Sequence, residues 1–224
     1  THARLSGDVD PGKAEQLESQ PGLSFEADFL RWMLSDGAGA AFLSNEPSPQ
    51  GLSLRIDWID LISYANEMET CMYAGADKLE DGTIRGWREP ASLANAIANH
   101  TFMIKQDVKL LNKEVITFAV ERALAELVVK HNLSAEAIDW FLPHYSSAYF
   151  RDDLRNRMEK IGLPIPTERW FTNLATKGNT GSASIYIMLE ELFHSGQLKK
   201  GEKLLCFIPE SGRFSMCYMM LTVC

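Results

Sequence analysis

The sequence lacks an excess of positive charge, a long apolar run and a cluster of metal ligands, and each absence excludes a class of function. Its net charge is −8, whereas binding to nucleic acid needs clustered Lys and Arg side chains to meet phosphates. No apolar run reaches the ~18–20 residues that are needed to cross a bilayer. What is present is ordinary for a globular protein, because 46% of the 224 residues are hydrophobic.

The cysteines are few and widely separated. Cys71, Cys206, Cys217 and Cys224 have neither the paired spacing of a zinc site nor the density of a disulfide framework. With no secretory signal in the sequence, we interpret all four as reduced thiols that serve in packing. We therefore expect a cytoplasmic protein without a bound metal, a membrane segment or a nucleic-acid partner.

The first half of the chain carries short structural signals. Residues 1–24 are polar and rich in turn formers, which is typical of a loop. Small and apolar residues over 34–43 predict a strand that packs closely against its neighbours. Alternation of apolar and polar residues over 52–58 predicts a half-buried strand. Residues 61–105 are interpreted as an elaboration over the active-site face, with a helix over 91–99; a role in the core or in a dimer contact is an equal alternative.

The pattern becomes regular after Asp107. A stripe of apolar residues predicts one long amphipathic helix that ends at His131. Further helices are expected over 146–161 and 180–195, and strands over 140–142, 170–173, 204–208 and 214–223. This alternation of helices and strands predicts a layered α/β sheet.

Two polar residues stand where strands are predicted to end. His144 follows the apolar run that begins at Trp140, and Asn179 follows Gly178 just before a predicted helix. Glycine permits a tight backbone turn there, and the start of a helix favours negative charge nearby. Each feature alone is more often a plain turn or a structural histidine. Together, a histidine and an asparagine at strand ends are able to converge on one oxygen atom.

Three motifs carry a family resemblance. The stretches Asp139-Trp-Phe-Leu-Pro-His144 and Gly178-Asn-Thr-Gly-Ser-Ala-Ser184 resemble the second half of β-ketoacyl-ACP synthase III and its thiolase-fold relatives. The stretch Ser35-Asp-Gly-Ala-Gly-Ala-Ala41 is similar to the family's Gly-Asp-Gly-Ala-Gly-Ala segment. The resemblance covers residues 29–45 and 106–224.

The resemblance implies an α/β, thiolase-like layered α/β/α fold with a mixed sheet. It implies that residues 106–224 form the C-terminal thiolase-like half and that residues 1–45 end the N-terminal half. Residues 46–105 are then a connection near the active-site face. The resemblance also implies a homodimer.

The resemblance implies a decarboxylative condensation of an acyl thioester with a malonyl-type thioester in fatty acid or polyketide biosynthesis. His144 and Asn179 are then the donors that stabilise the enolate oxygen, and backbone donors at Gly212 form a second oxyanion hole. The residues expected to contact the substrate are Ser147, Tyr149, Arg151 and Gly178. The substrates are thioesters of coenzyme A or of a carrier protein's phosphopantetheine, with no permanently bound cofactor.

The sequence departs from the family pattern in three places. His144-Tyr-Ser-Ser147 replaces His-Gln-Ala-Asn, which predicts altered contacts to phosphopantetheine or coenzyme A. Pro209-Glu-Ser-Gly212 replaces Phe-Gly-Gly-Gly, and these bulkier residues predict a reshaped pocket and a non-standard acyl substrate. The nucleophilic cysteine that precedes the Asp-Gly-Ala-Gly segment in the family has no counterpart. We therefore expect this chain to be inactive and aggregated by itself, with the cysteine on a missing N-terminal segment. The alternatives are a non-catalytic companion subunit and an acyl-thioester-binding module of a ketosynthase complex.

Overall fold

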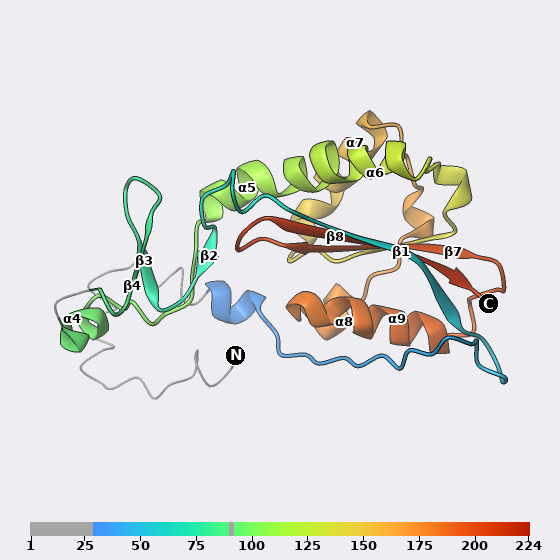
Figure 1. Ribbon diagram of the computed structural model, residues 1–224, viewed down its shortest axis with the longest axis horizontal. Helices are drawn as coiled ribbons and strands as arrows, with labels where there is room; N and C mark the ends of the chain where they lie inside the picture. The colour runs from blue at the N-terminus through green and yellow to red at the C-terminus, as the bar shows by residue number, and fades with distance from the viewer. Residues whose placement is uncertain (1–28, 90–91) are drawn as a thin grey trace.

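A computed structural model describes residues 29–89 and 92–224, and its centre is a four-stranded mixed sheet (Figure 1). The strand order is β1-β8-β7-β6. The strands are β1 (Leu54–Ser63), β6 (Trp140–Pro143), β7 (Lys203–Glu210) and β8 (Ser215–Val223). Only β6 and β7 are parallel, and the other two pairs are antiparallel. The mixed sheet agrees with the prediction, while the loop predicted over 1–24 lies outside the described residues.

Helices cover both faces of this sheet. In Figure 1 one layer lies above the sheet and another lies below it. The upper layer contains α5 (Val108–Ile116), the π-helix η1 (Thr117–Leu124), α6 (Ala125–Lys130) and α7 (Arg151–Lys160). The lower layer contains α8 (Leu174–Lys177) and α9 (Ser184–His194). Short 3-10 turns join them: η2 (Ala135–Ala137), η3 (Ala148–Phe150), η4 (Thr167–Arg169) and η5 (Gly181–Ala183).

The central strand β7 shows why the sheet needs two helical layers. Its side chains alternate between faces, as a pleated strand requires. Leu205 and Phe207 belong to the core cluster under the upper helices. Leu204 and Cys206 belong to the cluster around α9. All four side chains are fully buried, so the strand reads in the sequence as a continuous apolar run.

Within the upper layer, α5, η1 and α6 form one continuous helical run, as the apolar stripe predicts. Asp107 caps its start, because its Oδ1 accepts a hydrogen bond from the Leu110 N–H at 2.9 Å. His131 follows the last residue of α6. The middle of the run is wound as a π-helix, where the Ala119 carbonyl accepts a hydrogen bond from the Tyr218 hydroxyl of β8 at 2.8 Å. The apolar stripe alone does not predict that wider winding.

The strand predicted over 170–173 is wrong. Trp170 makes only an isolated parallel bridge with Phe141. The pairing stops at once because the Asn173 carbonyl accepts bonds from the Thr176 and Lys177 N–H groups, which begins α8. The chain leaves the sheet edge three residues after the bridge and forms a helical turn.

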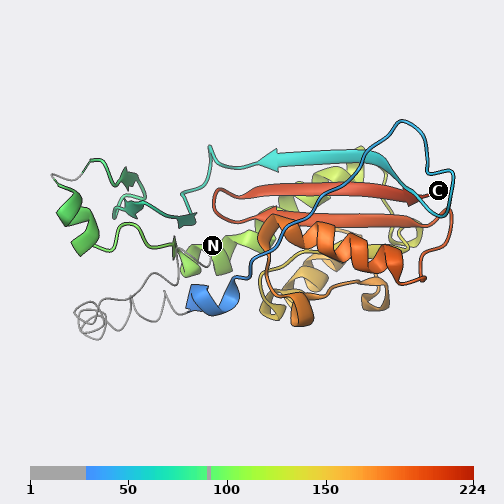
Figure 2. The same ribbon diagram turned by 90° about the horizontal axis from the view of Figure 1, so that it is seen from below.

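The prediction that residues 34–43 form a strand of the sheet is also wrong. Residues 29–33 are helical, Leu34 makes one isolated bridge with Asn179, and the chain then runs extended without a strand partner. Figure 2 shows this segment crossing α9 on the underside of the molecule. A Cβ atom at Gly39 would overlap the Tyr186 side chain. The small residues are therefore needed for close approach, as predicted, but the neighbour is a helix.

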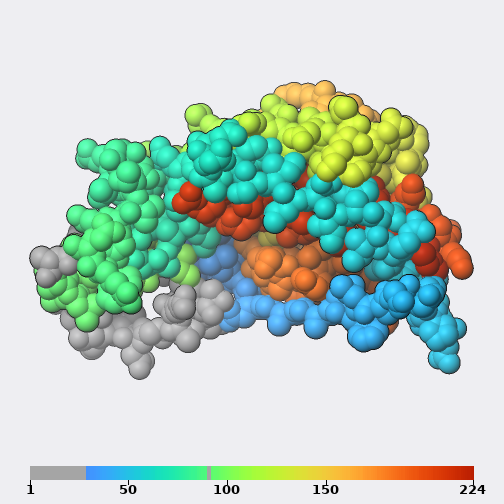
Figure 3. Space-filling model, in the orientation of Figure 1, coloured from blue at the N-terminus to red at the C-terminus, as the bar shows by residue number. Residues whose placement is uncertain are grey.

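A lobe formed by residues 64–89 and 92–107 projects beyond one end of the sheet (Figures 1 and 3). It contains β2 (Met72–Tyr73), β3 (Ala76–Lys78), β4 (Ile84–Gly86), α4 (Leu93–Ala98) and β5 (Lys105–Gln106). The strands form two small antiparallel pairs, β2 with β5 and β3 with β4. An ion pair between Lys78 of β3 and Asp107 at 2.8 Å ties the lobe to the start of α5, and one between Asp77 and Lys105 at 2.6 Å ties β3 to β5 within the lobe. The helix predicted over 91–99 is present as α4.

Candidate active site

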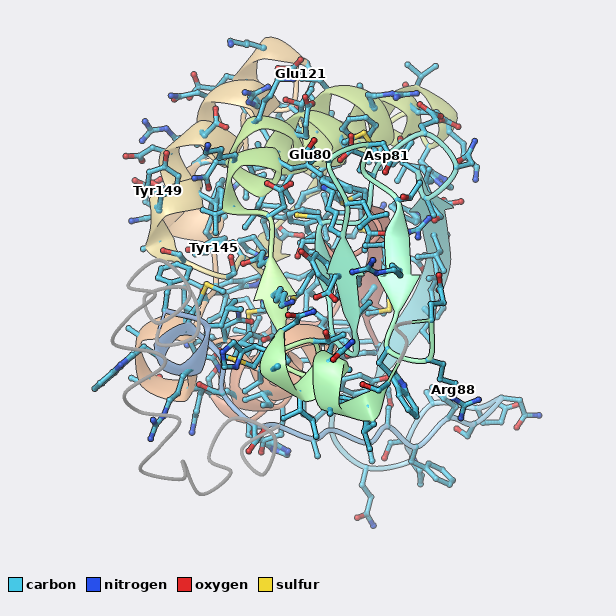
Figure 4. The ribbon with its side chains drawn as sticks, turned by 90° about the vertical axis from the view of Figure 1, so that its left-hand side faces the viewer. Glu80, Asp81, Arg88, Glu121, Tyr145 and Tyr149 are labelled. Atoms are coloured by element: carbon cyan, nitrogen blue, oxygen red, sulfur yellow. The ribbon has the colours of Figure 1, made fainter. Side chains whose placement is uncertain are left out.

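The candidate site lies at the end of the sheet where β6 and β7 finish. Figure 4 looks onto this end, with the lobe strands in front of it. His144 follows the last residue of β6, and its N–H donates to the Phe207 carbonyl of β7 at 2.8 Å. The lobe is joined to the same end, because the Cys71 N–H donates to the Gly212 carbonyl of the β7–β8 turn at 2.9 Å. The lobe thus reaches the end of the sheet that carries His144.

His144 is a buried histidine without a charged partner. Only 7% of its surface is exposed, and within the described residues its ring makes no hydrogen bond. Burial lowers the pKa of His144 to about 4, because an imidazolium loses its hydration there. At neutral pH the ring is therefore uncharged, with one N–H to donate and one nitrogen to accept.

Asn179 is held by its own turn. Gly178 has φ 76° and ψ −175°, a combination that is essentially restricted to glycine. The Asn179 carbonyl accepts a bond from the Ser35 N–H at 2.8 Å, and its Oδ1 accepts one from the Gly181 N–H at 3.1 Å. The side-chain oxygen is thus engaged, and the Nδ2 group is the end of the amide that is left to donate.

The side-chain donors of His144 and Asn179 are not fully enclosed. In the described residues, the fully enclosed side-chain nitrogens and oxygens without a partner are Arg85 Nε and Gln106 Oε1. The His144 ring nitrogens and Asn179 Nδ2 are not among them, although Asn179 is only 5% exposed. Each buried side chain therefore presents its free polar atoms toward accessible space.

A small polar cavity of about 10 Å³ lies beside His144, which is the size of about one water molecule. Its lining residues are Pro143, His144, Tyr145, Thr172, Asn173, Leu174, Gly178, Ser184 and Met188. The end of β6 and the Gly178 turn thus share one cavity. Of the predicted site residues, the cavity brings together His144 and Gly178, and Asn179 follows directly in the chain.

The predicted substrate contacts Ser147, Tyr149 and Arg151 lie away from that cavity. Ser147 caps η3, because its Oγ accepts a hydrogen bond from the Tyr149 N–H at 3.2 Å. Tyr149 is 72% exposed, and Figure 4 shows it on the outer side of the molecule, farther from the sheet than Tyr145. Arg151 is also exposed, at the first position of α7.

Gly212 lies in the turn between β7 and β8, at the same end of the sheet. Its N–H is not free, because it donates to the Glu210 carboxylate. The prediction of an oxyanion-hole donor at Gly212 is therefore corrected: in this structure the Gly212 N–H is already bonded to Glu210. The sequence feature that indicates this bond is Glu210 at a position where the family has a small residue, because its carboxylate is able to accept the Gly212 N–H.

None of the cysteines has the surroundings of a nucleophile. Cys71 is fully buried, and burial raises the pKa of its thiol to about 12. Burial also raises the pKa of the Cys206 and Cys217 thiols. Cys224 lies beside Ser53, at the opposite end of the sheet from His144. A nucleophile needs a thiolate, so these residues are suited to packing.

The described residues offer neither a metal site nor a membrane-spanning helix. Over residues 29–89 and 92–224, no three His, Cys, Asp or Glu side chains are grouped as a metal would require. Among the same residues no helix is long and apolar enough to cross a bilayer.

Comparison with known proteins identifies the family that the chain resembles. Residues 128–211, which include His144 and Asn179, match the model of the 3-oxoacyl-[acyl-carrier-protein] synthase III C-terminal family. The β-ketoacyl-[acyl-carrier-protein] synthase III of Clostridium perfringens is 35% identical over 101 residues, which cover 44% of this chain and 30% of that protein. The corresponding protein of Prochlorococcus marinus is 28% identical over 183 residues, which cover 78% of this chain and 46% of that protein.

Solved structures give the same answer for the fold. The β-ketoacyl-[acyl-carrier-protein] synthase III of Thermus thermophilus superimposes with a TM-score of 0.52 at 25% identity, covering 75% of this chain and 46% of that one. A tetronic acid condensing enzyme superimposes with a TM-score of 0.56 at 16% identity, covering 75% and 47%. The chain thus spans about half the length of these relatives or less. It is similar to the C-terminal portion of β-ketoacyl-[acyl-carrier-protein] synthase III-like condensing enzymes and has their thiolase-like fold.

Proposed function

We propose that this chain supplies the enolate-stabilising half of a decarboxylative condensing site. The observation that supports this most is the pairing of a buried, neutral His144 with Asn179, whose amide oxygen is already engaged and whose Nδ2 is free. Two neutral donors at one end of the sheet suit an oxygen that becomes negative only during the reaction. A charged histidine would bind the ground-state anion as well, and it would also be able to protonate the enolate.

The proposed reaction needs these donors in one step. A malonyl-type thioester loses CO₂, and the electron pair of the broken C–C bond moves into an enolate whose charge rests on the thioester oxygen. The enolate carbon then attacks the carbonyl carbon of an acyl group held on a cysteine. A new C–C bond forms, the C–S bond to the cysteine breaks, and the thiolate leaves. Each donor to the enolate oxygen is worth about 3–4 kcal/mol of barrier.

The nucleophile is proposed to come from a cysteine-bearing N-terminal segment that packs against the underside of this chain. All four thiols of the sequence are unsuited by burial or position. The segment that runs along the underside in Figure 2 instead exposes large apolar side chains, with Trp32 at 86%, Phe42 at 95% and Leu43 at 72% exposure. Such exposure favours an interface with another polypeptide surface.

The acyl donor is proposed to be a thioester of coenzyme A or of a carrier protein. Tyr149 and Arg151 are exposed outside the cavity, and we propose that a phosphate-bearing arm passes them before its thioester reaches the cavity. Arg151 offers a planar, permanently charged donor for a phosphate there. The wider role is in fatty acid or polyketide biosynthesis.

A second candidate is an acyl-thioester-binding module or a non-catalytic companion subunit. The observation that favours it is the lack of a reactive thiol, since burial raises the pKa of Cys71 to about 12. A binding module would hold the same thioester at the same site without forming a carbon–carbon bond. An acyl-enzyme mass shift on the full gene product separates the two candidates.

The test of the condensing function compares His144→Ala and Asn179→Ala in the assembled enzyme that includes the nucleophilic cysteine. Each change is expected to lower the rate of condensation by ~100-fold or more. Acylation of the cysteine, measured by intact mass, should stay near the wild-type rate. His194→Ala is the matched control, because His194 is exposed at the end of α9. Equal loss of acylation and condensation in a folded variant would refute the assigned roles.

A further inference from the structure

The β7–β8 turn contains a carboxylate that bonds to its own backbone. Glu210 is exposed, yet its Oε1 accepts a hydrogen bond from the buried Gly212 N–H. Its Oε2 accepts a second bond from the Arg213 N–H at 3.1 Å. A Cβ atom placed at Gly212 would lie only 2.5 Å from Oε1. The carboxylate therefore lies directly against the Gly212 peptide group and is the acceptor of its N–H.

The backbone of the turn is anchored separately from this carboxylate. Arg213 donates to Thr70 Oγ1 at 2.9 Å and to the Ala65 carbonyl at 2.7 Å. The Gly212 carbonyl accepts a bond from the Cys71 N–H at 2.9 Å. With the peptide groups held by the lobe, the Glu210 side chain is the part that is able to swing into solvent. Its movement would uncover the Gly212 N–H without remodelling the turn.

We propose that Glu210 is a specificity-determining residue that competes with the substrate's thioester carbonyl for the Gly212 N–H. This inference rests on the proposed function, because the competing oxygen is that of the acyl thioester. A hydrogen bond between a backbone N–H and a carboxylate is stronger than one to a neutral carbonyl. The carboxylate must therefore be displaced before the thioester is polarised, and thioesters that bind poorly elsewhere are rejected. Free coenzyme A has no thioester carbonyl and does not enter this competition.

The experiment measures binding of octanoyl-CoA and of free coenzyme A by calorimetry to the full gene product. Glu210→Ala is expected to tighten octanoyl-CoA binding about 10-fold, since a hydrogen bond to a charged group is lost from the unbound state. Binding of free coenzyme A should not change. Glu136→Ala is the matched control, because it removes one exposed carboxylate at the other end of β6. Amide hydrogen exchange provides a second readout, with faster exchange of Gly212 and Arg213 expected only in Glu210→Ala.

The outcomes separate this inference from the proposed function. Equal tightening of octanoyl-CoA and free coenzyme A would show an effect of charge on the coenzyme, which overturns the competition but leaves thioester binding intact. Unchanged octanoyl-CoA binding in Glu210→Ala also overturns the competition alone. No binding of octanoyl-CoA by wild type or variant would overturn both proposals.

Discussion

Burial of His144 makes a quantitative prediction about acid sensitivity. The pKa of His144 is lowered to about 4 in the folded protein, against 6.5 for an unburied histidine. A histidine whose pKa is lowered in the folded protein binds a proton more readily in the unfolded chain. Its neutral form therefore favours folding fully above pH ~6.5, and this contribution is lost as the pH falls toward 4.

The magnitude follows from the two pKa values. Between them, each unit of pH costs about 1.4 kcal/mol of unfolding free energy. From pH 7 to pH 5 the His144 contribution is therefore about 2 kcal/mol. Carboxylates such as Asp107, whose pKa is lowered in the folded protein, also weaken the protein in acid. A variant without His144 is therefore needed to separate the contribution of this histidine from that of the carboxylates.

The assay is urea denaturation of wild type and His144→Gln at pH 7 and pH 5. The glutamine does not titrate, so the variant should lose about 2 kcal/mol less than wild type over this interval. Its stability at pH 7 is irrelevant to the comparison, because only the pH dependence is read. His194→Gln removes an exposed histidine and should retain the wild-type dependence. Parallel pH dependences in wild type and His144→Gln would refute the argument that His144 is buried and neutral.

Three further predictions concern the backbone and the thiols. In a urea titration, Gly178→Ala should lower the unfolding free energy by about 3 kcal/mol, because alanine is strained at φ 76° and ψ −175° and its Cβ would overlap Ser35. Gly162→Ala is the control, because Gly162 has φ 80° but lies in open space. It should lower the unfolding free energy by only about 1–2 kcal/mol. Gly39→Val should lower the melting temperature, because the added side chain would overlap Tyr186. Cys71 should resist iodoacetamide at pH 8 and become labelled in urea, as mass spectrometry would detect; fast labelling without urea would contradict its raised pKa.

The sequence by itself determined the parts of the fold that depend on local periodicity. The apolar run of β7 is buried on both faces, so every residue type in it had to be apolar. The stripe after Asp107 has the period of a helix, and Asp107 caps that helix. The turn at Gly178 was also predictable from the sequence, because glycine is the residue that adopts the backbone angles of this turn. His144 and Asn179 were found through motif resemblance at these same positions.

Tertiary structure alone decided which apolar segments pair. Residues 34–43 and 170–173 have compositions that are compatible with strands, but a strand exists only where a partner accepts its hydrogen bonds. The first segment instead lies on α9, and the second turns into α8 after one bridge to Phe141. The hydrogen bond from the Gly212 N–H to Glu210 was equally unpredictable from local pattern, because the Glu210 carboxylate accepts it only when the β7–β8 turn is folded. Local pattern specifies which face of an element is apolar, whereas contact between distant segments specifies what covers that face.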